Sequence, residues 1–269
     1  MEEIQEKKKG KGPVITIILL VIIILGLVCY ICYDKGMIFS KKTEKETKTE
    51  EKTTTKEKEE NVTFSDSELE KYVNYIFPAS YGPSELLYNI DTVDTKKLSV
   101  SDKIKYIAGQ VYSKHTSTSD YSYDIISEAD VKSVLEEIYG PNTYEKTTFN
   151  LGCGDYTLNE NDKNYYSKTG CGGTTATYTS NVITGYKATK SKLEITTTYA
   201  FLDGETNTIY KDYNKTISLD TYTGSMTEDS QVYLDNYVKN NKDKLNTLVY
   251  TFESTNGRNY YFTSLKNNR

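Results

Sequence analysis

The chain has 269 residues and a formal net charge of -5, with 26 Tyr, a single His and no Trp. One imidazole excludes any mechanism that needs two, including zinc sites built from several histidines. Between positions 61 and 269 there are 21 basic and 27 acidic residues. This part of the chain lacks the basic footprint of nucleic-acid-binding domains, so we expect no nucleic-acid partner.

The first element in chain order is an uncharged apolar run at 14–33. A helix of this length measures about 30 Å, the thickness of the hydrocarbon core of a bilayer. A cleaved signal peptide is the alternative, but its apolar region is normally shorter and a small-x-small cleavage site should follow it. We predict a single transmembrane helix at 14–33 behind a short cytoplasmic tail at 1–13.

The orientation of this helix rests on its flanking charges. Four lysines lie between residues 7 and 11, and five lie between residues 35 and 48. The count of positive charges therefore does not decide the orientation by itself. The first group is adjacent to the helix start, whereas the second is diluted by acidic residues. We predict a single-pass protein of the cell membrane with its N-terminus inside and its C-terminal domain outside.

A charged stalk is predicted at 34–60. Within it, residues 41–60 are all Lys, Thr or Glu, so this stretch has no apolar side chain to bury and favours disorder. A Glu/Lys helix is the alternative, but the β-branched run Thr53, Thr54, Thr55 weakens it. The stalk would tether an extracytoplasmic domain at 61–269.

The first part of this domain, 61–140, has a mainly helical pattern. Ser65 and Glu68 form a capping box ahead of an apolar stripe, and Pro78 would end that helix. A second helix is predicted to begin near Ser101. A third runs from Ser127 to a stop at Gly140.

The second part, 141–269, is predicted to be mainly strands. Apolar and polar residues alternate at 143–149, 192–202, 207–213 and 248–252. The pairs Asp203-Gly204 and Asn256-Gly257 predict hairpin turns, and a short helix is expected within 229–245. The fold class that follows is α+β, with about three helices followed by an antiparallel β-sheet.

Two glycine-flanked cysteines, Cys153 and Cys171, are the clearest local feature. Their midpoint falls inside the polar run 159–164, so a hairpin there would bring them opposite one another. We predict a disulfide between them, worth about 3 kcal/mol for a loop of this size. Free thiols are the alternative, followed by a catalytic or metal-binding role.

Other chemical signals are weak. His115 is the only base available to a cysteine nucleophile, and its place at a predicted helix end fits a surface role better. The sequence at 168–170, Lys-Thr-Gly, matches one box of penicillin-binding proteins, but no Ser-x-x-Lys accompanies it. Asp155, Glu160 and Asp162 could bind calcium, but the pattern is more typical of acidic side chains in a solvent-exposed loop. We predict no catalytic residue, metal or cofactor.

Tyrosine is the remaining candidate for ligand contact. Adjacent pairs occur at Tyr165-Tyr166 and Tyr260-Tyr261, and on a strand one ring of each pair faces outward. These four residues are the predicted ligand-binding set.

The sequence leaves the activity itself undetermined. The function we expect is a non-catalytic binding or scaffolding module at the cell envelope, with a protein or polysaccharide partner. The alternative is an enzyme that modifies cell wall or extracellular polymer through unidentified carboxylates.

Overall fold

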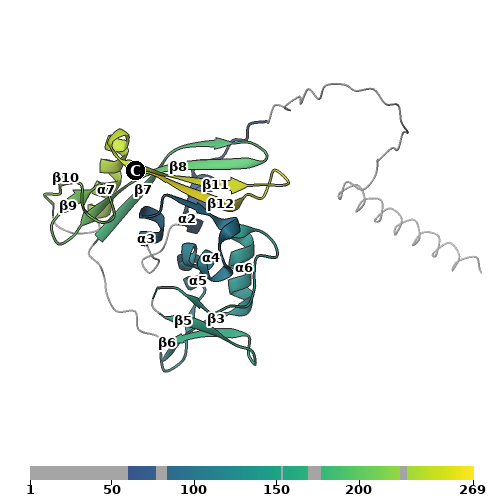
Figure 1. Cartoon of the computed structure of the whole chain (residues 1–269). Helices are drawn as coiled ribbons and strands as arrows, with labels where there is room; N and C mark the ends of the chain where they lie inside the picture. The colour runs from purple at the N-terminus through teal and green to yellow at the C-terminus, as the bar shows by residue number, and fades with distance from the viewer. Residues whose placement is uncertain (1–59, 77–83, 153, 169–176, 225–228) are drawn as a thin grey trace, which may run out of the picture. The chain divides into compact units, whose positions relative to one another are not determined.

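The computed structural model describes residues 60–76, 84–152, 154–168, 177–224 and 229–269 (Figure 1). Glu57–Arg269 form one compact unit. The predicted transmembrane helix and nearly all of the stalk lie outside the described residues. Within the described ranges, no helix combines the length and the apolar character needed to cross a bilayer.

The described helices are α2 (Asp66–Ile76), α3 (Ser84–Tyr88), α4 (Val100–Tyr106), α5 (Ala108–Tyr112), α6 (Glu128–Tyr139) and α7 (Asp229–Asn241), with short 3₁₀ turns at Thr95–Lys97 and Lys242–Lys244. The capping box at α2 is present. Ser65 N donates to Glu68 Oε2 at 2.8 Å, and Glu68 N donates to Ser65 Oγ at 3.4 Å. Helix α6 begins after Ser127, whose Oγ accepts from Asp130 N at 3.0 Å, and it ends at Gly140.

The predicted second helix is divided in two. Ile107, at φ -117° and ψ 22°, interrupts the helix between α4 and α5. Its side chain is fully buried, and its non-helical backbone ends α4 and precedes α5. Ser99 caps α4, so that the helix begins slightly earlier than expected from Ser101.

Two antiparallel sheets complete the fold. The larger has the order β1 (Thr92–Asp94), β12 (Tyr261–Asn268), β11 (Asn246–Glu253), β8 (Lys192–Asp203), β9 (Thr208–Tyr210) and β10 (Ser218–Thr221), with β7 (Thr177–Ala188) on the other side of β8. The smaller has the order β2 (Thr116–Ser117), β3 (Tyr123–Ser127), β6 (Asn164–Lys168), β5 (Asp155–Asn159) and β4 (Phe149–Asn150).

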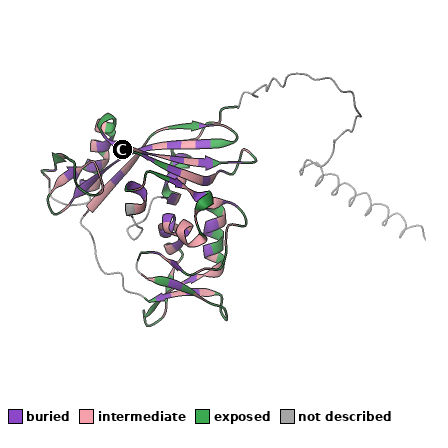
Figure 2. Ribbon diagram, viewed as in Figure 1, coloured by how far each residue is buried: buried purple, intermediate pink, exposed green. Residues whose placement is uncertain are grey.

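Helices α2, α4, α5 and α6 lie between the two sheets, and the main core fills this layer (Figures 1 and 2). From the large sheet, alternate residues of β8 and β11 point into it, including Leu193, Ile195 and Phe252. The small sheet contributes Ile126 and Tyr165. The intervening residues of β8, such as Ala200 and Leu202, form a second core under α7. The period-2 alternation of β8 therefore serves two cores, one on each face.

The α+β class is confirmed, but helices and strands do not follow one another in two blocks. Strands β1, β2 and β3 precede residue 140, and α7 follows it. The strand expected at 143–149 is absent apart from Phe149. Side-chain bonds hold this stretch instead: Thr143 Oγ1 donates to Gly140 O at 2.7 Å, and Tyr144 Oη donates to Glu128 Oε1 at 3.0 Å.

Candidate functional site

The first predicted tyrosine pair lies on β6. Tyr165 is fully buried, and its hydroxyl is 2.9 Å from that of Tyr144. Tyr166 is half-buried on the other face, where its hydroxyl donates to Asp162 Oδ2 at 2.6 Å. Its ring meets Tyr123 edge to face at 6.3 Å. Tyr166 is therefore the member of this pair whose side chain is accessible to a ligand.

The second pair lies at the start of β12. Tyr260 is 4% exposed, and its hydroxyl donates to Thr189 O at 2.7 Å. Tyr261 is half-buried and packs beside Gly140 at the end of α6. Both residues line a cavity of about 290 Å³. The second pair thus contributes to a concave surface.

We call this concave surface the tyrosine groove. Helix α2, helix α6 and the approach to β12 build it, and its lining consists of Lys71, Tyr72, Tyr75, Glu136, Glu137, Asn259, Tyr260 and Tyr261. Because side chains three and four residues apart share one face of a helix, α2 presents Lys71 and Tyr75 together. The rings supply flat apolar surface, and the lysine, carboxylates and amide supply hydrogen-bonding groups.

A small polar network lines the groove. Tyr75 Oη donates to Glu137, whose carboxylate also lies 3.6 Å from Lys71 Nζ. Lys71 Nζ in turn lies 5.5 Å from the centroid of the Tyr75 ring. Burial, together with the bond to Glu137, raises the pKa of Tyr75. Hydrogen bonding to Tyr75 raises the pKa of Lys71. At neutral pH Tyr75 is therefore protonated and Lys71 is charged.

Aromatic contacts join the groove to the core. The ring of Tyr72 lies 6.1 Å from Tyr75, 6.4 Å from Tyr260 and 5.0 Å from Phe252. Phe252 is fully buried on β11. These ring contacts fix the side chain of Tyr72, so a ligand that binds to it would remove little side-chain entropy.

The acidic residues considered as a calcium site are engaged elsewhere. Lys146 and Lys163 donate to Glu160 and lower its pKa to about 2. Asp155 accepts from Asn150 Nδ2 at 2.9 Å, and Asp162 accepts from Tyr166. Across the described ranges, no group of three or more His, Cys, Asp or Glu residues is arranged to hold a metal ion.

His115 stacks on the ring of Tyr112 at 4.0 Å, with its Nδ1 at 2.8 Å from the Tyr112 carbonyl oxygen. Cys153 and Cys171 lie outside the described residues, as does most of the Lys-Thr-Gly sequence at 168–170. A hairpin does connect β5 to β6, with Asn159 opposite Asn164. The disulfide stays a prediction.

Sequence reasoning missed part of the groove. The apolar stripe predicted after the capping box includes Tyr72, which the structure places in the lining of the groove, and Lys71 and Tyr75 are not among the residues predicted to contact a ligand. A lysine and a tyrosine four residues apart were visible in the sequence, but their meeting with Glu137 depends on how α2 packs against α6. No known protein family, no curated protein and no solved structure matches the chain.

Proposed function

We propose that the protein is a membrane-anchored, non-catalytic binding module of the cell envelope that holds a polysaccharide in the tyrosine groove. Sugar rings have apolar C–H faces and a rim of hydroxyl groups. The groove offers matching chemistry, because tyrosine rings line it together with the charged pair Lys71–Glu137 and the amide of Asn259. This combination in one cavity is the observation that carries the proposal.

The test is a calorimetric titration of the full-length chain with purified cell-wall polysaccharide. Tyr75→Ala and Tyr261→Ala should each weaken binding about tenfold, because aromatic residues dominate the energy of such contacts. Tyr233→Ala is the matched control, since Tyr233 is 38% exposed on α7 and does not line the groove. Equal losses in all three variants, or none in the groove variants, would reject the assignment.

An enzymatic role is the second candidate, because two carboxylates, Glu136 and Glu137, line the same groove. Glu136 Oε1 already accepts from Asn142 N at 3.1 Å, and Glu137 is paired with Lys71. Incubation of the polymer with the chain and with Glu137→Gln, followed by measurement of new reducing ends, separates the two functions. Cleavage that disappears in Glu137→Gln would establish the enzyme.

A further inference from the structure

Strand β7 forms an edge of the large sheet. It pairs with β8 along its length. On its other side, the structure pairs only its end, where Val62 N donates to Ala188 O at 3.1 Å and Asn61 bridges Thr189, within the described ranges. Long strands with an open edge are uncommon in proteins, because they can recruit another strand.

The backbone groups that face the open side can be identified. Near the start of β7, Gln231 Nε2 on α7 donates to Thr179 O at 3.1 Å, so the Thr179 carbonyl points outward. Alternate residues of a strand point the same way, which places Asn181 and Ile183 on the open side. The register shifts between Ile183 and Gly185. Beyond the shift, the carbonyl of Ala188 accepts from Val62 N and therefore points outward. The backbone groups of Tyr186, two residues earlier, point the same way. The edge is thus closed at both ends and open between them.

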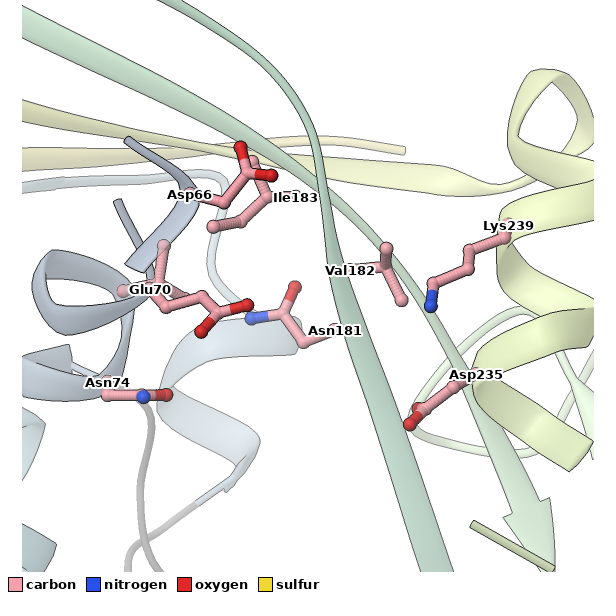
Figure 3. Close-up of a pocket in the computed structure, with 9 residues that line it drawn as sticks. Asp66, Glu70, Asn74, Asn181, Val182, Ile183, Asp235 and Lys239 are labelled. Carbon is pink, nitrogen blue, oxygen red and sulfur yellow. The ribbon is translucent and has the colours of Figure 1, made fainter. Parts of the chain in front are cut away.

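A cavity of about 410 Å³ lies along this open stretch. It is lined by Asp66, Glu70, Val73 and Asn74 of α2, by Asn181, Val182 and Ile183 of β7, and by Asp235 and Lys239 of α7. Figure 3 shows β7 running between the two helices, with Asn181 directed toward α2 and Val182 toward α7. We call it the β7 groove. Helices α2 and α7 therefore flank this stretch of β7.

The charge of the β7 groove is mainly negative, with the carboxylates of Asp66, Glu70 and Asp235 facing one lysine, Lys239. The side chain of Asn181 has one hydrogen-bonding atom without a partner among the described residues. Its Nδ2 donates to Tyr250 Oη at 2.9 Å, while its Oδ1 is buried and accepts from no group in the described part of the chain. A buried acceptor without a donor is costly. The groove therefore carries an excess of negative charge and one buried acceptor without a donor.

We propose that the β7 groove binds an extended, lysine- or arginine-containing polypeptide segment of a partner protein, which adds to the large sheet as a further strand. The backbone of the segment pairs with Asn181, Ile183 and Tyr186, and its basic side chains meet Glu70 and Asp66. The groove offers one strand edge, that of β7, between α2 and α7. A second copy fits less well, because its own β7 edge carries the same two helices.

The test uses the full-length chain and synthetic peptides of about nine residues with Lys at alternate positions and Thr or Val between them. Fluorescence anisotropy measures binding, and amide hydrogen exchange locates it. The amides of Asn181, Ile183 and Tyr186 should exchange fast in the free chain and slow by about tenfold or more with peptide. A peptide with N-methylated backbone should not bind, because it cannot complete the ladder.

Matched variants separate the groove from general charge attraction. Glu70→Lys should weaken binding about tenfold, whereas Glu145→Lys, the same change at an exposed site away from β7, should leave it unchanged. Equal binding of the N-methylated peptide, or an absence of protection on β7, would overturn the proposal. Protection of these amides in the absence of peptide would overturn it too. If dilution removes that protection, a second copy of the chain fills the edge. If dilution does not remove it, residues of the same chain fill the edge.

Discussion

At the scale of single residues, tyrosine does much of the packing that leucine and phenylalanine do in most cores. Tyr88, Tyr165, Tyr199 and Tyr250 are all at most 2% exposed. A buried tyrosine normally finds a partner for its hydroxyl. Tyr199 donates to Asn267 Oδ1 at 2.9 Å. The hydroxyl of Tyr88 is buried with no hydrogen-bond partner among the described residues.

This difference predicts opposite effects of one substitution. Tyr199→Phe should lower the free energy of unfolding by about 1 kcal/mol, because it leaves Asn267 with an unsatisfied acceptor. Tyr88→Phe should leave stability unchanged or raise it by about 1 kcal/mol, because it removes an unpaired polar atom. Urea unfolding of both variants measures the two changes. A large loss of stability in Tyr88→Phe would reveal a partner for its hydroxyl.

Asp203, the last residue of β8, connects the β8–β9 turn to the loop between β9 and β10. Its carboxylate accepts from Lys215 Nζ at 2.6 Å and from Glu205 N at 2.8 Å. The side chain is only 10% exposed. The bond from Lys215, followed by the backbone bonds, lowers the pKa of Asp203 below its ordinary value of 3.8.

The lowered pKa predicts a pH-dependent contribution to stability. A carboxyl whose pKa is lower in the folded state stabilises the fold at pH values above its unfolded pKa of 3.8, and the contribution is lost as the pH falls through the folded pKa. Asp203→Asn should therefore reduce stability by about 2 kcal/mol at neutral pH and by much less at the acid end. Unfolding curves between pH 7 and about pH 2 test this. Asp243→Asn, at an exposed site, should show no such trend.

At the scale of secondary structure, the end of α6 is coupled to the tyrosine groove. Gly140 stops the helix with φ +99°, a conformation that residues with a Cβ rarely adopt, and a Cβ there would lie 3.4 Å from the ring of Tyr261. The glycine allows both the turn of the backbone and the position of the ring.

Gly140→Ala should therefore lower the free energy of unfolding by about 1–2 kcal/mol and also weaken polysaccharide binding. Gly185→Ala is the control, because a Cβ at Gly185 meets nothing within 4 Å and its backbone is not in the left-handed region. Thermal unfolding and calorimetric binding, measured on the same samples, report the two effects. Loss of stability in Gly140→Ala with binding intact would separate the helix end from the groove.

At the scale of the whole molecule, the sequence predicts where the domain lies. Protease added to intact cells should cut within 41–60 and release the C-terminal domain, because a stretch of only Lys, Thr and Glu has no apolar residue to bury. Immunoblotting of cells and supernatant follows the release. A domain that becomes sensitive only after lysis would reverse the predicted orientation.

The same location predicts the state of the cysteines. Outside the cell, nothing keeps thiols reduced, so Cys153 and Cys171 should be joined. Peptide mass spectrometry without reductant should find the linked pair, and Cys153→Ser should destabilise the domain by about 2–4 kcal/mol. Free alkylation of both thiols in native protein would contradict the disulfide and weaken the case for an external domain.

The sequence correctly predicts those features that depend on residues close together along the chain. The capping box of Ser65, the stop at Gly140 and the alternation in β8 and β11 each act within a few residues, and each is present in the structure. Strand β7 was missed because it is an edge strand with most of its residues half-buried, which leaves no clear period of two. Strands of two or three residues, such as β1 and β2, are too short for any period.

The sequence by itself determined the α+β class and the place of most long elements, because these depend on composition and on spacing along the chain; the anchor and the stalk stay predictions. Only the tertiary structure decided that Tyr165 is buried, that Tyr75 and Lys71 meet Glu137, and that β7 keeps an open edge between α2 and α7. Both grooves join α2 to strand residues more than a hundred positions away along the chain. Their geometry follows from the packing of those elements, which spacing along the chain does not encode.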